Sequence, residues 1–116
     1  MPIDTILHWG IVVHMIFIED DGFHKRRKGL LNDDELFELM EWLVVHPDAG
    51  KVIPGSGGLR KVRCAARGHG KRGGARVIYF WWLGDEKILL LDIYAKGEQE
   101  NLAASEIKKL RQRIIE

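Results

Sequence analysis

The sequence predicts a single α+β domain with the element order β-α-α-β-β-β-α, in which a small antiparallel sheet carries helices packed on one face. Three observations lead to this prediction. The length of 116 residues is that of one domain. Apolar residues make up 46% of the chain and charged residues 30%, as in ordinary globular proteins. Three strand-like segments also follow one another between helical segments.

The chain opens with an apolar run over residues 11–18, which is too short to span a bilayer. The only charged side chain before it is Asp4, whereas a signal peptide would need a basic start. We therefore expect a cytoplasmic protein that does not associate with membranes.

Met15 lies inside this run and leaves two natural starts open, at Met1 and at Met15. We expect residues 1–14 to be an N-terminal extension. Residues 15–116 would then form the single domain, with a first strand over Met15–Glu19.

Two helices are expected next. A short helix between Asp20 and Leu31 carries four consecutive cations, Lys25 to Lys28, which form either a solvated face or a supplementary nucleic-acid contact. The clearest helix begins at Asn32, because Glu35 stands at the spacing of a capping box. Its apolar positions repeat at helical spacing, its methionine and tryptophan are expected in the core, and Pro47 ends it.

The second half of the chain reads as a series of strands joined by glycine-rich connections. Strands are expected over residues 59–66, 75–83 and 87–95, and the second of these is expected to be central. A glycine-rich connection (50–58), a basic glycine loop (67–74) and a hairpin turn (84–86) join them, and a last helix spans residues 102–115.

The formal net charge of +1 is the sum of opposed blocks. Residues 1–50 carry four Lys or Arg and ten Asp or Glu (−6), residues 51–84 carry eight cations and no acid (+8), and residues 85–116 carry six cations and seven acids (−1). An acid-free segment with this many cations indicates either a polyanionic partner or a solvated basic loop.

Strand alternation sorts the side chains of these segments between two faces. In the last strand, Leu89, Leu91, Ile93 and Ala95 form a wholly apolar face expected to carry the helices, and the alternate residues form the other face. If the strands are neighbours, that other face gathers five candidate catalytic residues, with Asp92 at its edge: Lys61, Arg63, Arg76, Tyr94 and Lys96. The alternative is a structural tyrosine among ordinary surface cations.

Such a set of side chains suits the cleavage of RNA. The 2′-hydroxyl of RNA can itself attack the adjacent phosphate, so the enzyme has to hold the phosphate, offset its charge and exchange two protons. Arginine binds phosphate in a bidentate manner, and lysine and tyrosine can exchange protons.

Two other motifs are rejected as functional signals. Gly68, Gly70 and Gly73 match the dinucleotide fingerprint, but a strand follows them where the fingerprint needs a helix. The five histidines show no spacing typical of metal ligands, and the lone cysteine, Cys64, is expected to be a small buried hydrophobe.

Three segments together carry a resemblance: Val52–Arg63 (VIPGSGGLRKVR), Gly70–Tyr79 (GKRGGARVIY) and Leu91–Glu98 (LDIYAKGE). In their order and spacing they resemble the RelE/HigB-like toxins of bacterial type II toxin–antitoxin systems, within the RelE/ParE superfamily. The resemblance covers about Met15 to Glu116 and implies a fold of the microbial ribonuclease type.

The resemblance implies a metal-independent endoribonuclease, an mRNA interferase that cuts mRNA on the 70S ribosome without a cofactor. It also implies a cognate helix-turn-helix antitoxin, through which alone the toxin would contact DNA. Lys61 and Arg63 match the paired basic strand positions of such toxins, Arg76 matches the arginine that opens the next strand, and Tyr94 and Lys96 occupy the end of the last strand. The remaining cations of the segment are assigned to RNA binding: Arg60, Arg67, Lys71 and Arg72.

The chain departs from the best-known members in one respect. Leu102 and Ala103 stand in the C-terminal segment where some members place a catalytic tyrosine, so the general base and the general acid stay open. Two other functions also stay open: a toxin of the same fold that inhibits DNA gyrase by binding, and a degenerate member that binds only its antitoxin or RNA.

Overall fold

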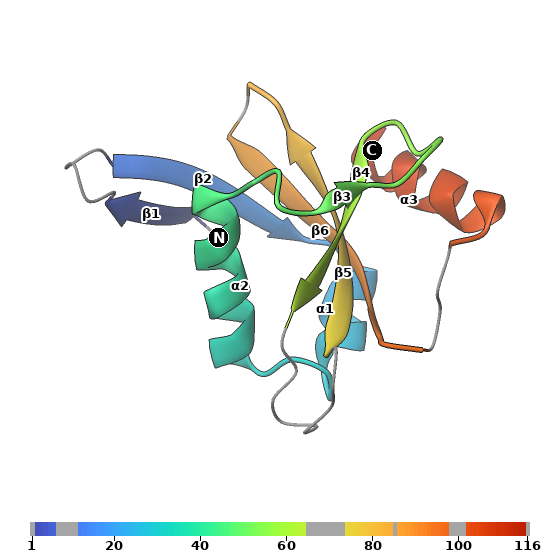
Figure 1. Ribbon diagram of the computed structural model, residues 1–116, viewed down its shortest axis with the longest axis horizontal. Helices are drawn as coiled ribbons and strands as arrows, with labels where there is room; N and C mark the ends of the chain where they lie inside the picture. The colour runs from blue at the N-terminus through green and yellow to red at the C-terminus, as the bar shows by residue number, and fades with distance from the viewer. Residues whose placement is uncertain (1, 7–11, 65–73, 85, 98–101, 116) are drawn as a thin grey trace.

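The structure is a computed structural model that describes residues 2–6, 12–64, 74–84, 86–97 and 102–115. Three helices and a six-stranded sheet make up this part of the chain (Figure 1). In chain order the elements are β1 (Pro2–Ile6), β2 (Val12–Glu19), α1 (Asp21–Arg27), α2 (Asp33–Val45), β3 (Lys51–Val52), β4 (Leu59–Cys64), β5 (Ala75–Trp82), β6 (Lys87–Ala95) and α3 (Ala104–Ile115).

The strands lie in the order β1-β2-β6-β5-β4-β3. The predicted α+β class is confirmed, and β5 is central as expected. The sheet is mixed, however, because β2 pairs with β6 in parallel while every other pair is antiparallel. Between β2 and β6 the chain passes through α1, α2 and three further strands. This long connection allows β6 to lie beside β2 in the same direction.

Residues 2–6 and 12–14, which precede Met15, belong to the sheet. β1 pairs with β2 from Pro2↔Ile16 to Ile6↔Val12, and Ile3 is buried in the core. The domain start at Met15 stays a prediction, but residues 2–6 form the edge strand of the same sheet.

The capping box predicted for α2 is confirmed. The Oδ1 atom of Asn32 accepts a hydrogen bond from the backbone N–H of Glu35 at 2.7 Å, and the Oε1 atom of Glu35 accepts one from the backbone N–H of Asn32 at 3.0 Å. Met40 is buried as expected, whereas Trp42 is 53% exposed and stacks on His46. The core position expected for Trp42 is therefore wrong, because its side chain lies at an open hollow that α2 shares with Arg63 and Cys64 of β4.

The helices cover both faces of the sheet, which corrects the expectation of one covered face. α1 and α2 pack with Phe17, Val77 and Tyr79 in the larger core, whereas Leu110 of α3 packs with Ile78 in a second core on the opposite face. The physical reason is the composition of β5: Val77, Ile78 and Tyr79 are all fully buried, and a strand that is apolar on both sides needs cover on both sides.

A β-bulge in β6 corrects the predicted alternation of that strand. Ile78 pairs with Asp92 and Tyr79 with Leu90, so Leu91 is an extra residue without a partner in the ladder. Beyond the bulge the side chains exchange faces. Ile93 joins the larger core with Ile88 and Leu90, while Leu91 shares the α3 face with Tyr94.

Candidate active site

The register of β4, β5 and β6 places three of the predicted site residues in one row. Arg63 pairs directly with Arg76, and Arg76 pairs directly with Tyr94. Directly opposed residues of antiparallel strands project to the same face, with Cβ atoms about 4.5–5.5 Å apart. The row lies on the face that carries α3, because Tyr94 belongs to the core of that face.

Lys61 and Tyr94 meet at a pocket of about 320 Å³ between β3, β4, β6 and the α3 side of the sheet. Its lining is made of two lysines, one tyrosine and an apolar wall: Lys51, Val52, Ile53, Pro54, Lys61, Tyr94, Leu102 and Ile107. Tyr94 is only 5% exposed and lies at the inner side of this pocket.

Lys51 was missed by the sequence analysis. It pairs directly with Lys61 across β3 and β4, and both line the pocket. β3 has only two residues, Lys51 and Val52, so no alternation of side chains could reveal it within its glycine-rich surroundings.

Arg63 belongs to the row, but its side chain does not line the pocket that Lys61 and Tyr94 share. Its side chain is exposed and lines a second hollow of about 240 Å³ beside α2, together with Glu35, Glu38, Trp42 and Cys64. Burial, followed by the nearby Glu35 carboxylate, raises the pKa of the Cys64 thiol to about 11. Cys64 is therefore protonated at neutral pH. It packs against the larger core but is only partly buried, which corrects the expectation of a buried residue.

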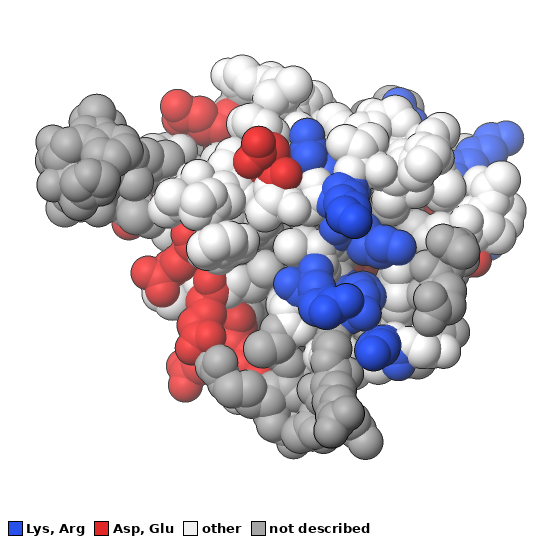
Figure 2. Space-filling model, viewed as in Figure 1, with Lys and Arg blue, Asp and Glu red and all other residues white. Residues whose placement is uncertain are grey.

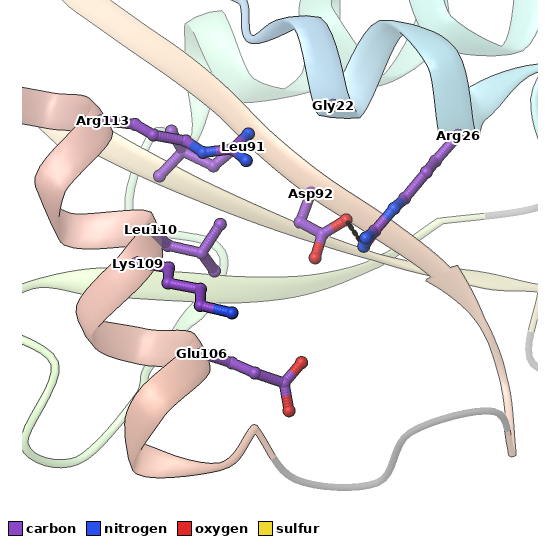
Figure 3. A pocket seen from close by; sticks show the side chains of 8 residues that line it. All are labelled: Gly22, Arg26, Leu91, Asp92, Glu106, Lys109, Leu110 and Arg113. Carbon is purple, nitrogen blue, oxygen red and sulfur yellow. Dashed lines mark hydrogen bonds and ion pairs between the residues drawn. The ribbon is translucent and has the colours of Figure 1, made fainter.

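Lys96 and Asp92 differ in exposure. Lys96 is exposed one residue beyond β6, and its backbone N–H donates to the carbonyl of Gly74 at 3.2 Å. Asp92, expected at the edge of the site, is buried and accepts a 2.6 Å hydrogen bond from Arg26 of α1 (Figure 3).

This ion pair lies in a third, smaller hollow of about 150 Å³ between α1, β6 and α3. In Figure 3, Lys109 and Glu106 extend from α3 toward Asp92, and Arg113 extends toward α1. Arg113 also forms an ion pair with Asp20 at the start of α1. The Arg113–Asp20 ion pair thus connects α3 to the start of α1, and the Arg26–Asp92 pair connects α1 to β6.

Of the four residues assigned to RNA binding, only Arg60 lies in the described part of the chain; Arg67, Lys71 and Arg72 lie outside it. The guanidinium of Arg60 donates to the backbone carbonyls of Asp48 at 3.2 Å and Gly50 at 2.8 Å. Arg60 therefore holds the connection that leads into β3 and Lys51.

Tyr79 also holds the connection that leads into β3, through two hydrogen bonds of its hydroxyl group. Its hydroxyl donates to the carbonyl of Pro47 at 2.7 Å and accepts from the N–H of Gly50 at 2.9 Å. Burial raises the pKa of Tyr79, which keeps this hydroxyl protonated as a donor. Tyr79 is a structural tyrosine, in contrast to Tyr94 at the pocket.

The surface charges separate as the sequence blocks suggest. Figure 2 shows lysine and arginine side chains gathered over the strands near the middle of the view, and acidic side chains along the side formed by α2. The exposed acidic residues of α2 are Asp33, Asp34, Glu38 and Glu41, whereas Glu35 is buried. Lys51 and Lys61 line the pocket, and Arg63 and Arg76 belong to the row, so this part of the sheet carries cations that favour a polyanion.

No family model matches the sequence. Among solved structures, a mutant of the toxin RelE of E. coli, carrying two arginine-to-alanine substitutions and determined in the free state, matches with a TM-score of 0.54. The match covers 88% of this chain and 98% of that chain at 16% sequence identity. The chain has the RelE fold.

This result confirms the resemblance at the level of the fold. The RelE fold accounts for the α+β class and for the sheet on which Arg76, Tyr94 and Lys61 are brought together. No helix within the described residues is both long and apolar enough to cross a membrane.

Proposed function

We propose that this chain is a RelE-like toxin, a metal-independent endoribonuclease that cuts mRNA on the ribosome. The observation that carries the proposal is the pairing of Arg76 with Tyr94 beside a pocket lined by Lys51 and Lys61, on a sheet with the RelE fold. RNA cleavage by the substrate's own 2′-hydroxyl needs charge stabilisation and proton transfer, and an arginine, two lysines and a tyrosine at one place can supply both.

In the proposed reaction the 2′-hydroxyl attacks the adjacent phosphorus and the bond from phosphorus to the 5′-oxygen breaks. A base removes the proton of the 2′-hydroxyl and an acid protonates the leaving 5′-oxygen, which yields a 2′,3′-cyclic phosphate and a 5′-hydroxyl end. Lys51, Lys61 and Tyr94 all line the pocket and carry groups able to exchange protons, and we assign this role to Lys61 and Tyr94. Arg76 offsets the charge of the pentavalent phosphate. Arg63, whose side chain lies at the hollow beside α2, and Lys96, one residue beyond β6, bind the RNA backbone.

The proposal extends to partners and location. Arg60, Arg67, Lys71 and Arg72 would contact RNA of the 70S ribosome and mRNA, a contact that weakens with salt. A cognate helix-turn-helix antitoxin would neutralise the toxin in the cytoplasm, and residues 15–116 would be the toxin domain.

The test is primer extension on mRNA bound to purified ribosomes, with the full chain and with Arg76→Ala. We expect cuts in the ribosomal A site with the wild type and a loss of about a hundredfold or more with Arg76→Ala. Lys87→Ala is the control, because Lys87 lies at the opposite end of β6 from Tyr94 and should cut like the wild type.

Two results would contradict the proposal. Toxicity with a DNA-damage response and no cuts would indicate a gyrase inhibitor, and absence of both toxicity and cuts would indicate a degenerate member. A folded Arg76→Ala protein that cuts fully would show that the site assignment is wrong.

A further inference from the structure

The pocket beside Tyr94 has a charged side and an apolar side. Lys51 and Lys61 form the charged side, and Ile53, Pro54, Leu102 and Ile107 are on the apolar side. Its volume of about 320 Å³ lies at the lower end of the range for small-molecule sites. The two sides together match the two parts of a nucleotide, an anionic phosphate and an apolar base.

The charged side is set by the strand register. Lys51 and Lys61 are directly opposed in the β3–β4 ladder, and like charges in that position disfavour strand pairing. An anion placed between the two ammonium groups offsets this repulsion. A phosphate group of the RNA backbone is such an anion, and it would make two charge-assisted hydrogen bonds there.

The apolar side comes from two elements that hydrogen bonds hold together. The Oγ atom of Ser56 donates to the carbonyl of Ile53 at 2.5 Å and accepts from the N–H of Leu59 at 3.1 Å. Arg111 of α3 donates to the carbonyls of Ser56 at 3.0 Å and Gly57 at 2.8 Å. The connection from β3 to β4 is therefore tied to α3, and the wall is in place before a ligand arrives.

We propose that this pocket binds one whole nucleotide of the RNA, with its phosphate between Lys51 and Lys61 and its base against the apolar wall. Lys51 is then a substrate-binding residue. The inference rests on the proposed function and adds to it the place where one nucleotide of the substrate is held.

The first test measures binding of an inert probe, a short fully 2′-O-methylated RNA, to the full-length protein by fluorescence anisotropy. The methyl group removes the attacking hydroxyl, so binding is separated from cleavage. We expect Lys51→Ala to weaken binding at least about tenfold and to lower the slope of log affinity against log salt by about one. Lys51→Arg should retain most of the affinity, and Lys108→Ala, an exposed change on α3, should bind like the wild type.

The second test addresses the base. The same probe with one abasic nucleotide should bind the wild type more weakly than the intact probe by about fivefold or more, because a stacked base contributes about 1–3 kcal/mol. Pro54→Ser should reduce this difference between the two probes. Pro54 is exposed outside both cores, so the variant should retain the fold, which thermal unfolding checks.

The outcomes separate the two proposals. A wild type that cuts ribosome-bound mRNA while Lys51→Ala binds the probe with unchanged affinity and salt slope overturns the inference alone. Equal affinities for the intact and abasic probes overturn the base-binding part. A wild type that never cuts, yet binds the probe through Lys51, overturns the proposed function and supports the nucleotide site.

Discussion

Arg76 pairs directly with Tyr94 across β5 and β6, and both residues are shielded from water, Arg76 in part and Tyr94 almost fully. In the proposed reaction, this pairing would bring a phosphate-binding arginine and a tyrosine that can exchange a proton to one place on the sheet. The two side chains are held by the central ladder of the sheet, so their relative position does not depend on a loop.

The first prediction compares the two tyrosines. Tyr94→Phe should lower cleavage of ribosome-bound mRNA by about a hundredfold, since proton transfer by a side chain contributes 10²–10⁴ in rate. Tyr79→Phe should instead lower the free energy of unfolding by about 1–3 kcal/mol, because it leaves the N–H of Gly50 without its acceptor. Urea unfolding and primer extension on both variants check this; full cleavage by Tyr94→Phe would make Tyr94 a structural residue too.

The second prediction concerns the ion pair of Arg26 with Asp92. The side chain of Asp92 is 8% exposed, so Arg26→Ala leaves a buried carboxylate with less compensation and should cost about 1–3 kcal/mol of the free energy of unfolding. In an Asp92→Asn background the same substitution should cost less, by a coupling of at least about 0.5 kcal/mol in urea unfolding.

The neighbouring Lys25→Ala is the matched control, because Lys25 is exposed on the same helix and should change stability by less than about 0.5 kcal/mol. Equal costs for Arg26→Ala and Lys25→Ala would show that the pair does not stabilise the fold.

The parts of this structure that were predictable from sequence are those determined by neighbours along the chain. The capping box of Asn32 and Glu35 depends on residues three positions apart, and the bounds of β6 follow from a mostly apolar segment that comes after a turn. The bulge at Leu91 depends instead on how β6 meets β5, and the parallel pairing of β2 depends on a strand about 70 residues later. No pattern among neighbouring residues in the sequence predicts either the bulge or the parallel pairing.

The residues of the candidate site also fall into those that the sequence predicted and those that depend on how the strands and α3 meet. Strand alternation predicted Lys61, Arg76 and Tyr94 on one face, and Lys61 and Arg76 also lie in the acid-free segment 51–84. The strand register pairs Arg76 directly with Tyr94. Lys51 was missed because it faces the site only through its pairing with Lys61. The apolar wall was missed because α3 was expected on the other face, where its contact with the pocket would not exist.

The third prediction concerns alkaline pH. The pKa of Cys64 is raised from 9.0 to about 11 in the folded protein, mainly by burial. Above pH 9 the unfolded chain therefore loses this proton while the folded chain keeps it, and stability falls until the pH passes the folded pKa. We expect a loss of up to about 2 kcal/mol between pH 9 and pH 11.

Cys64→Ala should lose this part of the pH dependence in urea unfolding, and the remainder belongs to other groups, including Tyr79, whose pKa is also raised. A wild type and a Cys64→Ala protein with parallel stability curves over this range would contradict the prediction.

The fourth prediction uses two glycines with the same backbone conformation. Gly55 and Gly57 both have φ of +71°, a region that costs other residues about 1–2 kcal/mol. A Cβ at Gly55 would meet nothing within 4 Å, whereas a Cβ at Gly57 would lie 2.1 Å from the Nη1 atom of Arg111. Gly57→Ala should therefore cost more stability than Gly55→Ala, by about 1–2 kcal/mol, because it also displaces the hydrogen bonds of Arg111 to this loop.

The difference between the two variants should disappear in an Arg111→Ala background, since only the backbone strain common to both glycines then remains. Gly57→Ala should also weaken binding of the 2′-O-methylated probe more than Gly55→Ala does, because Arg111 ties the wall of the nucleotide pocket to α3. The measurements are urea unfolding and anisotropy of the probe on Gly55→Ala and Gly57→Ala, each with Arg111 and with Arg111→Ala. Equal costs for the two glycine variants with Arg111 present would show that the loop is not held by α3.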